Sequence, residues 1–422
     1  MDNESVFEEW STYAKRKNLL PRNIDLDALV KNSNSKVIAV TGIRRSGKSS
    51  LLMMLAQKLA NDGEKVCYVN VEDSRIKDES NLLDEILKWF GDEGFMLLDE
   101  ITSANDWQGW ISRTHELLKG KLRIIISSSR KTVALPDKPL RGRILTYELF
   151  PLSFVEFLRF REIETEQTTA GRGRIEKAFE EYVKYGGFPE VVLAKDYTDK
   201  IKIINSYFKD IIGLDVAELS KQDLSTVEVF GKYVVQTSHF SASKCLNFLK
   251  TLGYKIGKEK ILELEKYSEA SYLFFFMPIF SNNIKDRSQY PRKAYCGDTG
   301  FYYGSSGRVD SGRLYEAAVF LEHKRRLQEQ KELFYWKNKL GFEVDFVLRK
   351  GINTVEAMQV VYDLDDKKTK ERETRALIEC DKELKPTKAT VITRNVKRVE
   401  KIGDVSIRFI PIIDWLMEGS DK

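Results

Sequence analysis

The stretch Gly42-Ile43-Arg44-Arg45-Ser46-Gly47-Lys48-Ser49-Ser50 decides the fold of this chain. Its first eight residues match the pattern G-x-x-x-x-G-K-S, in which backbone N–H groups at the start of a helix surround a phosphate. An apolar run at residues 37–40 precedes the loop, and apolar residues with good helix propensity follow it at 51–56. A strand, a glycine-containing loop and a helix in this order are the context that such a loop requires. We therefore predict that residues 42–50 bind the phosphates of a nucleotide.

Two side chains of this loop have separate expected roles. Lys48 would place a positive charge between the β- and γ-phosphates, and the hydroxyl of Ser49 would be a ligand of Mg²⁺. We therefore expect ATP or ADP, together with Mg²⁺, as the cofactor of the chain.

A pair of acids supplies the second half of the expected site. Residues 95–98 are apolar and are followed by Asp99 and Glu100. A buried strand that ends in two acids would bring both carboxylates to the edge of the sheet where the phosphates bind. We expect Asp99 to contact Mg²⁺ through water and Glu100 to polarise the attacking water as a general base.

Further candidates follow the next apolar run, at residues 122–126. Ser128 lies in a run of three serines at its end, and it either contacts the γ-phosphate or the water, or belongs to an ordinary serine turn. Arg141 and Arg143 follow a proline-containing loop at residues 135–139. They act either as an arginine finger across a subunit boundary or as surface contacts.

The order of these segments predicts the fold class. Strands alternate with helices, including a helix expected at residues 82–90, and this alternation favours a parallel sheet covered on both faces. The fold class is therefore α/β, with a P-loop nucleotide-binding sheet. A chain of 422 residues is too long for one core and predicts several domains.

Composition narrows the class of protein. The chain is 42% hydrophobic and 32% charged, and no apolar run approaches the roughly 20 residues that span a bilayer. Its four cysteines are scattered and it has three histidines, so a structural zinc site is not expected. The acidic first residues are unlike a signal peptide. We expect a cytoplasmic protein, without membrane contact, whose thiols are reduced. The net charge of +5 is too small to indicate nucleic-acid binding by itself.

Several strings together resemble a known family. They are residues 44–45, LDEI at 98–101, RGR at 141–143, LFPLSFVEF at 149–157, GGFPEVV at 186–192 and YFKDI at 207–211. The chain resembles archaeal and bacterial AAA-type P-loop ATPases that carry a C-terminal nuclease-like domain of unknown function. The resemblance covers nearly the whole chain and implies an AAA-type ATPase domain with a winged-helix segment behind it. In GGFPEVV, the glycines and the proline predict a helix end followed by a turn.

Residues 223–290 read as a winged-helix-like domain, with helices separated by a turn and then a strand pair. Lysines gather in this segment: Lys244, Lys250, Lys255, Lys258 and Lys260. They either contact DNA phosphates or are solvated side chains of a spacer between domains.

Residues 291–422 have the outline of a PD-(D/E)XK nuclease fold. Glu316 lies in an expected helix, and Asp345 lies in an expected strand that precedes another strand at 354–361. With a third acid these residues would hold Mg²⁺ in an active nuclease. Active nucleases of this fold carry a lysine two residues after the third acid, where it orients the attacking water. If Glu356 is the third group, Met358 stands at the position of this lysine. If Gln359 is the third group, Val361 stands there. The acids, with Glu343, either still bind a metal or pair with basic neighbours, and a degenerate domain could hold nucleic acid or protein.

The expected domains are therefore an N-terminal helical segment (1–35), the ATPase core (36–150), a helical lid or linker (151–222), the winged-helix-like domain (223–290) and the nuclease-like domain (291–422). The leading hypothesis is a Mg²⁺-dependent ATPase whose nucleotide state rearranges the later domains on DNA. The alternatives are a slow nucleotide-gated switch that binds a protein partner, and an ATP-controlled metal-dependent endonuclease. Assembly into a homo-oligomer is compatible with each.

Overall fold

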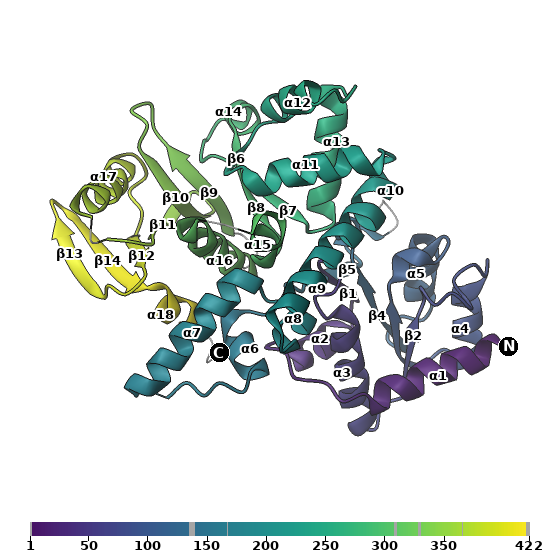
Figure 1. Ribbon diagram of the computed structural model, residues 1–422. Coiled ribbons are helices and arrows are strands. Elements are labelled where there is room, and N and C mark those ends of the chain that lie inside the picture. Colours follow the sequence, from purple (N-terminus) through teal and green to yellow (C-terminus); the bar gives the residue numbers. More distant parts are fainter. Residues whose placement is uncertain are drawn as a thin grey trace. The chain divides into compact units, whose positions relative to one another are not determined.

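The computed structural model describes residues 2–134, 140–166, 168–307, 310–327, 331–364 and 366–418. The chain divides into two compact units (Figure 1). The first contains residues 1–151 together with 270–272, and the second contains residues 152–269 and 273–422. None of the helices in the described ranges is both long and apolar enough to span a bilayer.

The first unit is built on a parallel sheet of five strands in the order β2-β3-β4-β1-β5. The strands are β1 (Val37–Thr41), β2 (Val66–Asn70), β3 (Gly94–Asp99), β4 (Leu122–Ser128) and β5 (Ile144–Glu148). The helices are α1 (Asn3–Arg16), α2 (Leu26–Asn32), α3 (Lys48–Asn61), α4 (Leu82–Phe90) and α5 (Trp107–Leu117), with short 3₁₀ turns η1 (Ile101–Ser103) and η2 (Lys131–Ala134).

Helices cover both faces of this sheet because its strands are apolar on both sides. In β1, Val37 and Ala39 join a core cluster with α4 and α5, whereas Ile38 and Val40 join a second cluster with α2 and α3. Alternating side chains of one strand thus enter two separate cores. The predicted parallel, doubly covered α/β sheet is confirmed.

The second unit begins with helices. They are α6 (Phe154–Phe160), α7 (Thr169–Tyr185), α8 (Pro189–Leu193), α9 (Tyr197–Asp210), the π-helical turn η4 (Ile211–Ala217) and α10 (Glu218–Ser220). The string LFPLSFVEF contains the start of α6. The Ser153 hydroxyl accepts the N–H of Glu156, and the Ser153 N–H donates to the Glu156 carboxylate, which makes a capping box. The predicted helix end in GGFPEVV is also confirmed, since α7 stops at Gly186 and Pro189 opens α8.

A three-stranded antiparallel sheet follows, in the order β6-β8-β7. Its elements are α11 (Leu224–Gln236), β6 (His239–Phe240), α12 (Ala242–Thr251), α13 (Lys258–Ala270), β7 (Phe274–Met277), α14 (Ile284–Gln289) and β8 (Arg292–Cys296). The central strand β8 lies after residue 290. The boundary expected at 290/291 would therefore separate β8 from both strands to which it is hydrogen-bonded.

A six-stranded mixed sheet completes the second unit, in the order β13-β14-β12-β11-β10-β9. Its elements are α15 (Gly300–Ser306), α16 (Ser311–Arg326), β9 (Lys331–Lys337), β10 (Glu343–Lys350), β11 (Asn353–Val361), α17 (Lys367–Leu384), β12 (Lys388–Thr393), β13 (Arg398–Ile402), β14 (Val405–Pro411) and α18 (Ile412–Met417). Helix α17 packs on one face of the sheet through Ala376, Leu377 and Cys380 (Figure 1).

Candidate nucleotide-binding site

The loop between β1 and α3 has a backbone that requires glycine at two positions. Gly47 caps the N-terminus of α3 at φ +99°, a left-handed conformation that other residues rarely adopt. At Gly42, a Cβ atom would lie 2.1 Å from the carbonyl oxygen of Leu149. Both glycines of the motif are therefore required by the conformation of the loop. This conformation leads directly into the first turn of α3, whose N–H groups are those that bind phosphate in such loops.

Lys48 is folded back over this loop. Its side chain is buried, with 4% of the residue exposed, and its Nζ donates to the carbonyl oxygens of Gly42 and Ile43, both at 3.1 Å. The same Nζ lies 3.7 Å from Glu100 Oε1. The ammonium is thus held where phosphate oxygens could replace the carbonyl groups as its partners.

Asp99 ends β3 and is 1% exposed. Tyr68 donates its hydroxyl to Oδ2 at 2.7 Å, and Ser127 donates its hydroxyl to Oδ1. Burial raises the pKa of Asp99, and the charge of Glu100 adds to this, while hydrogen bonds from Ser127, Ser49 and Tyr68 oppose it. Since the hydroxyl of Ser49 reaches Asp99, the two expected Mg²⁺ ligands are neighbours, and their oxygens are the donors that Mg²⁺ prefers.

Glu100 is held toward Lys48 by its backbone. It has φ +52°, which a non-glycine residue adopts at a cost of about 1 kcal/mol. Its N–H donates to Ser127 Oγ at 3.0 Å, and its Oε2 accepts the N–H of Ser129 at 3.1 Å. These contacts fix the carboxylate at the same edge of the sheet as the loop.

Ser128, the serine expected to sense the nucleotide, points elsewhere. Its Oγ lies 3.4 Å from Thr102 Oγ1 and accepts the N–H of Arg130 at 3.1 Å. Neighbouring residues of a strand face opposite sides, so Ser127, not Ser128, faces Asp99 and Glu100. The contact of Ser128 with the γ-phosphate or the water stays a prediction, whereas the contacts of Ser127 with both acids were not foreseen from the sequence.

Arg141 and Arg143 lie away from the site of their own chain. They precede β5, whose first residue pairs with Val37 at the start of β1, whereas the loop follows the end of β1. The five paired residues of these strands, at a rise of about 3.3 Å per residue, put about 13 Å between the two edges of the sheet. Arg143 also pairs with Glu116 at 3.2 Å, and Arg141 is exposed. The strand direction therefore places both arginines at the edge opposite the loop of their own chain, and the arginine finger across a subunit boundary stays a prediction. The expected loop at 135–139 lies outside the described residues.

Some contacts of the site were missed by sequence reasoning. The guanidinium of Arg22 donates to the carbonyl oxygens of Ser46 at 2.8 Å and Phe150 at 2.9 Å, which ties the loop to the segment after β5. Tyr272, far along the sequence, belongs to the first unit and places its hydroxyl 2.8 Å from Thr41 Oγ1. Only the folded chain brings these residues to the loop, and no local pattern marks them.

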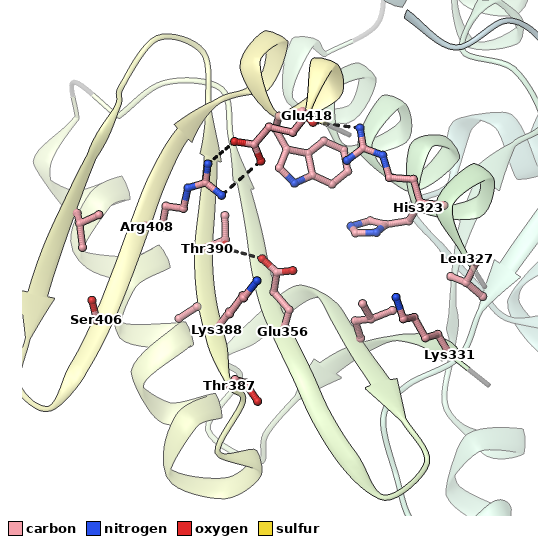
Figure 2. A pocket seen from close by; sticks show the side chains of 15 residues that line it. His323, Leu327, Lys331, Glu356, Thr387, Lys388, Thr390, Ser406, Arg408 and Glu418 are labelled. Atoms are coloured by element: carbon pink, nitrogen blue, oxygen red, sulfur yellow. Dashed lines mark hydrogen bonds and ion pairs between the residues drawn. The ribbon is translucent and has the colours of Figure 1, made fainter. Parts of the chain in front are cut away.

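In the second unit, three of the four acidic-site candidates come together. Glu316 and Asp345 both contact the buried Lys293, and the Asp345 N–H donates to Gln359 Oε1 at 3.1 Å. Gln359 therefore lies beside Asp345, and its part as the third group of a nuclease site stays a prediction. Glu356 lies in a different place: it lines a pocket of about 540 Å³ and accepts a hydrogen bond from Thr390 at 2.6 Å (Figure 2).

Comparison with known proteins identifies the first unit. Residues 34–158 match the AAA domain family, residues 176–309 match a Domain of unknown function (DUF8612), and residues 311–415 match a Domain of unknown function (DUF4143). The uncharacterized protein MJ1544 of Methanocaldococcus jannaschii is 31% identical over 98% of this chain and 96% of its own length. The chain belongs to the same family as MJ1544. An uncharacterized protein of Haemophilus influenzae is 26% identical over 95% of this chain and 100% of its own length.

The AAA match and the five-stranded parallel sheet establish an AAA-type P-loop ATPase domain. The C-terminal match is to a domain without known function, so the nuclease-like character of residues 291–422 stays a prediction.

Solved structures give more distant similarity. A RuvB protein of Thermotoga maritima is 14% identical, with 66% of this chain and 90% of that chain covered and a TM-score of 0.32. Replication initiator DnaA bound to AMPPCP and single-stranded DNA is 15% identical, with 63% and 92% covered and a TM-score of 0.29. Similarity at this level supports no statement about what this chain binds.

Proposed function

We propose that the chain is a Mg²⁺-dependent ATPase that uses ATP binding and hydrolysis to rearrange its second unit on a partner, for which DNA is the first candidate. The observation that carries this proposal is the meeting of Lys48, Ser49, Asp99 and Glu100 at one edge of the parallel sheet. A glycine loop with a lysine, a hydroxyl, a buried acid and a second acid is the set of groups that phosphoryl transfer to water needs.

Each residue has a definite task in this reaction. The N–H groups of residues 42–49 would bind the phosphates, and Lys48 would move from the loop carbonyls to the β- and γ-phosphate oxygens. Ser49 and Asp99 would hold Mg²⁺, which supplies neutralisation of the phosphate charge. Glu100, released from Lys48, would accept the proton of the attacking water while the Ser129 N–H keeps its carboxylate in place.

Two substitutions test these tasks. Lys48→Ala should abolish hydrolysis and weaken ATP binding, whereas Glu100→Gln should keep ATP bound and slow hydrolysis by about 10²-fold or more. Glu64→Gln removes an exposed carboxyl of the same unit and serves as the control. Hydrolysis by the Glu100→Gln protein at the parental rate would remove Glu100 from the reaction.

The case for DNA rests on the segment around the three-stranded sheet. Its order is helix, strand, helix, helix, strand, short helix, strand, and the three strands form one antiparallel sheet, which is compatible with a winged helix whose last two strands are joined by α14. The lysines at 244, 250, 255, 258 and 260 are all exposed on α12, α13 and the turn between them. Exposed lysines on one short stretch could neutralise several phosphates of a duplex.

The ATPase rate with duplex, single-stranded and branched DNA tests this part. If the chain acts on DNA, DNA should stimulate its ATPase rate. The variant Lys255→Ala/Lys258→Ala should reduce this stimulation, and the matched surface variant Lys195→Ala/Lys221→Ala should leave it unchanged. Slow hydrolysis that no DNA alters, with ADP retained on the purified protein, would favour the nucleotide-gated switch instead.

A further inference from the structure

A buried lysine occupies the centre of the acidic cluster in the second unit. Lys293 lies in β8 and is 4% exposed. Its Nζ lies 2.7 Å from Asp345 Oδ1, 2.9 Å from Glu316 Oε1 and 3.3 Å from Glu343 Oε1. One ammonium therefore contacts a carboxylate from α16 and two from β10.

The three carboxylates of the cluster also have other partners from this chain, both basic side chains and hydrogen-bond donors. Glu343 pairs with Lys337 at 3.1 Å and lies 3.3 Å from His239 Nε2. Tyr295 donates its hydroxyl to Glu316 at 2.6 Å, and the Val360 N–H donates to Asp345 Oδ2 at 2.9 Å. Two lysines and these hydrogen bonds thus compensate three buried or half-buried carboxylates.

The nuclease fold expected for this region would use the same acids to hold a divalent cation, and the geometry does not fit one. Mg²⁺ binds carboxylate oxygens at about 2.1 Å, so an ion shared by Asp345 and Glu316 would lie within a few Å of the Lys293 ammonium. Two cations at that distance in a buried site repel strongly. Among the described residues, no group of three or more His, Cys, Asp or Glu side chains is placed to hold a metal.

We propose that Lys293 is the resident cation of this cluster, in the place where a divalent metal would bind, and that these acids therefore do not support metal-dependent cleavage. Sequence reasoning found no lysine at residues 358 or 361. The folded chain supplies one from β8, and that lysine bonds the acids directly. It stabilises the structure and leaves no open position for a metal.

The protonation states agree with this assignment. Burial alone would lower the pKa of Lys293, but Asp345, Glu316 and Glu343 together raise it above its ordinary value, so the side chain stays charged. Burial raises the pKa of Asp345, and the charge of Lys293 opposes this shift.

The cluster also joins two sheets of the second unit. Lys293 belongs to the three-stranded sheet and is paired with His239 of β6, whereas Asp345 and Glu343 belong to the six-stranded sheet. The main chain continues the connection, since Phe280 N–H donates to the Tyr335 carbonyl oxygen at 2.6 Å and Tyr335 N–H donates to that of Pro278 at 3.1 Å. We therefore expect the two sheets to move as one body.

Titration with Mn²⁺, followed by the electron paramagnetic resonance of the free ion, tests the proposal on the full chain without nucleotide. Lys293→Met should gain a Mn²⁺ site, with affinity about tenfold or more above the parental protein, because removing the ammonium removes a buried like charge. Lys337→Met, which removes a lysine from the rim of the cluster, should gain none. Lys293→Met/Asp345→Asn should lose the gain.

Two results would overturn the proposal. One is a Mn²⁺ site in the parental protein that Asp345→Asn abolishes, and the other is no gain in Lys293→Met. If Lys293→Met is too unstable to titrate, Mn²⁺ should raise its melting temperature and leave that of Lys337→Met unchanged, and a failure of this rescue counts against the proposal. All these readouts are independent of ATP hydrolysis, so the ATPase proposal stands or falls separately.

Discussion

Arg22 is a single side chain, distant in sequence, that completes the phosphate-binding loop. It lies between α1 and α2 and bonds the carbonyl oxygens of Ser46 and Phe150. Hydrogen bonds that involve a charged group are worth about 1.5–3 kcal/mol. The loop conformation that binds phosphate therefore depends on a residue outside the motif.

Arg22→Ala should weaken ATP binding by about tenfold, because the loop loses a contact that fixes Ser46. Calorimetry with ATP and Mg²⁺ measures the effect, and Arg16→Ala, an exposed arginine of α1, is the control. Equal affinities of the Arg22→Ala and parental proteins would show that the motif residues alone determine the conformation of the loop.

Sequence reasoning found the residues of the site that lie within local patterns. The loop, Lys48, Ser49, Asp99 and Glu100 were all expected, because strand, loop and helix follow one another along the chain. It missed Arg22, Tyr68 and Ser127 as partners of these groups, since each contact joins distant segments. Lys293 was missed for the same reason, because it reaches the acids from another sheet and no residue beside the third acid marks it.

Among the elements, the junction of α7 and α8 depends on a glycine beside a buried carboxylate. Asp298 accepts the N–H groups of Gly187 at 2.8 Å and Gly300 at 2.9 Å. A Cβ at Gly186, which has φ +81°, would lie 1.6 Å from Asp298 Oδ1. The first residues of the string GGFPEVV thus form a turn and also contact the carboxylate of Asp298.

Gly186→Ala should destabilise the protein by about 3 kcal/mol or more, since both the left-handed backbone and the overlap with Asp298 oppose it. Gly173→Ala is the matched control, because that glycine lies within α7 and a Cβ there meets no atom within 4 Å. The control should be neutral or slightly stabilising. Chemical denaturation measures both, and equal stabilities of the two variants would contradict the assigned contact.

Helix α13 carries a buried acid that makes stability depend on pH. Burial raises the pKa of Glu265 to about 7, although Arg292 lowers it. The unfolded chain has a pKa of about 4.3, so the folded state binds the extra proton between these values. The contribution of Glu265 to the free energy of unfolding is therefore fully present at low pH, and it is lost as the pH rises through about 7.

Glu265→Gln should remove this loss. Its free energy of unfolding relative to the parental protein should rise between pH 5 and pH 8, by up to about 1.4 kcal/mol per pH unit within the window. Glu259→Gln, an exposed acid of the same helix, should show no such trend. A parallel pH dependence of the Glu265→Gln and parental proteins would show that Glu265 titrates normally.

At the scale of the whole molecule, the order and direction of the strands determine which residues lie near the nucleotide loop of the same chain. The sequence predicted the strands and their covering helices, but not that β4 lies between β1 and β3, because strand order follows from packing of distant segments. This order and the parallel direction place Arg141 at the edge opposite the nucleotide loop. If Arg141 acts in hydrolysis, it must act on another copy.

Mixing two inactive variants tests this role. Lys48→Ala lacks phosphate binding and Arg141→Ala lacks the arginine, so a mixture should recover about a quarter of the parental rate only if the arginine of one copy serves the site of another. An Arg141→Ala protein with the full parental rate would instead make Arg141 a surface residue.

We propose that residues 42–50 and Asp99 bind ATP with Mg²⁺, and calorimetry on the nucleotide-free chain tests this binding most directly. We predict one ATP bound per chain in the presence of Mg²⁺, with affinity lowered in Lys48→Ala and its Mg²⁺ dependence lost in Ser49→Ala. Equal heats of binding for the parental and Lys48→Ala proteins, or no binding to either, would contradict the account.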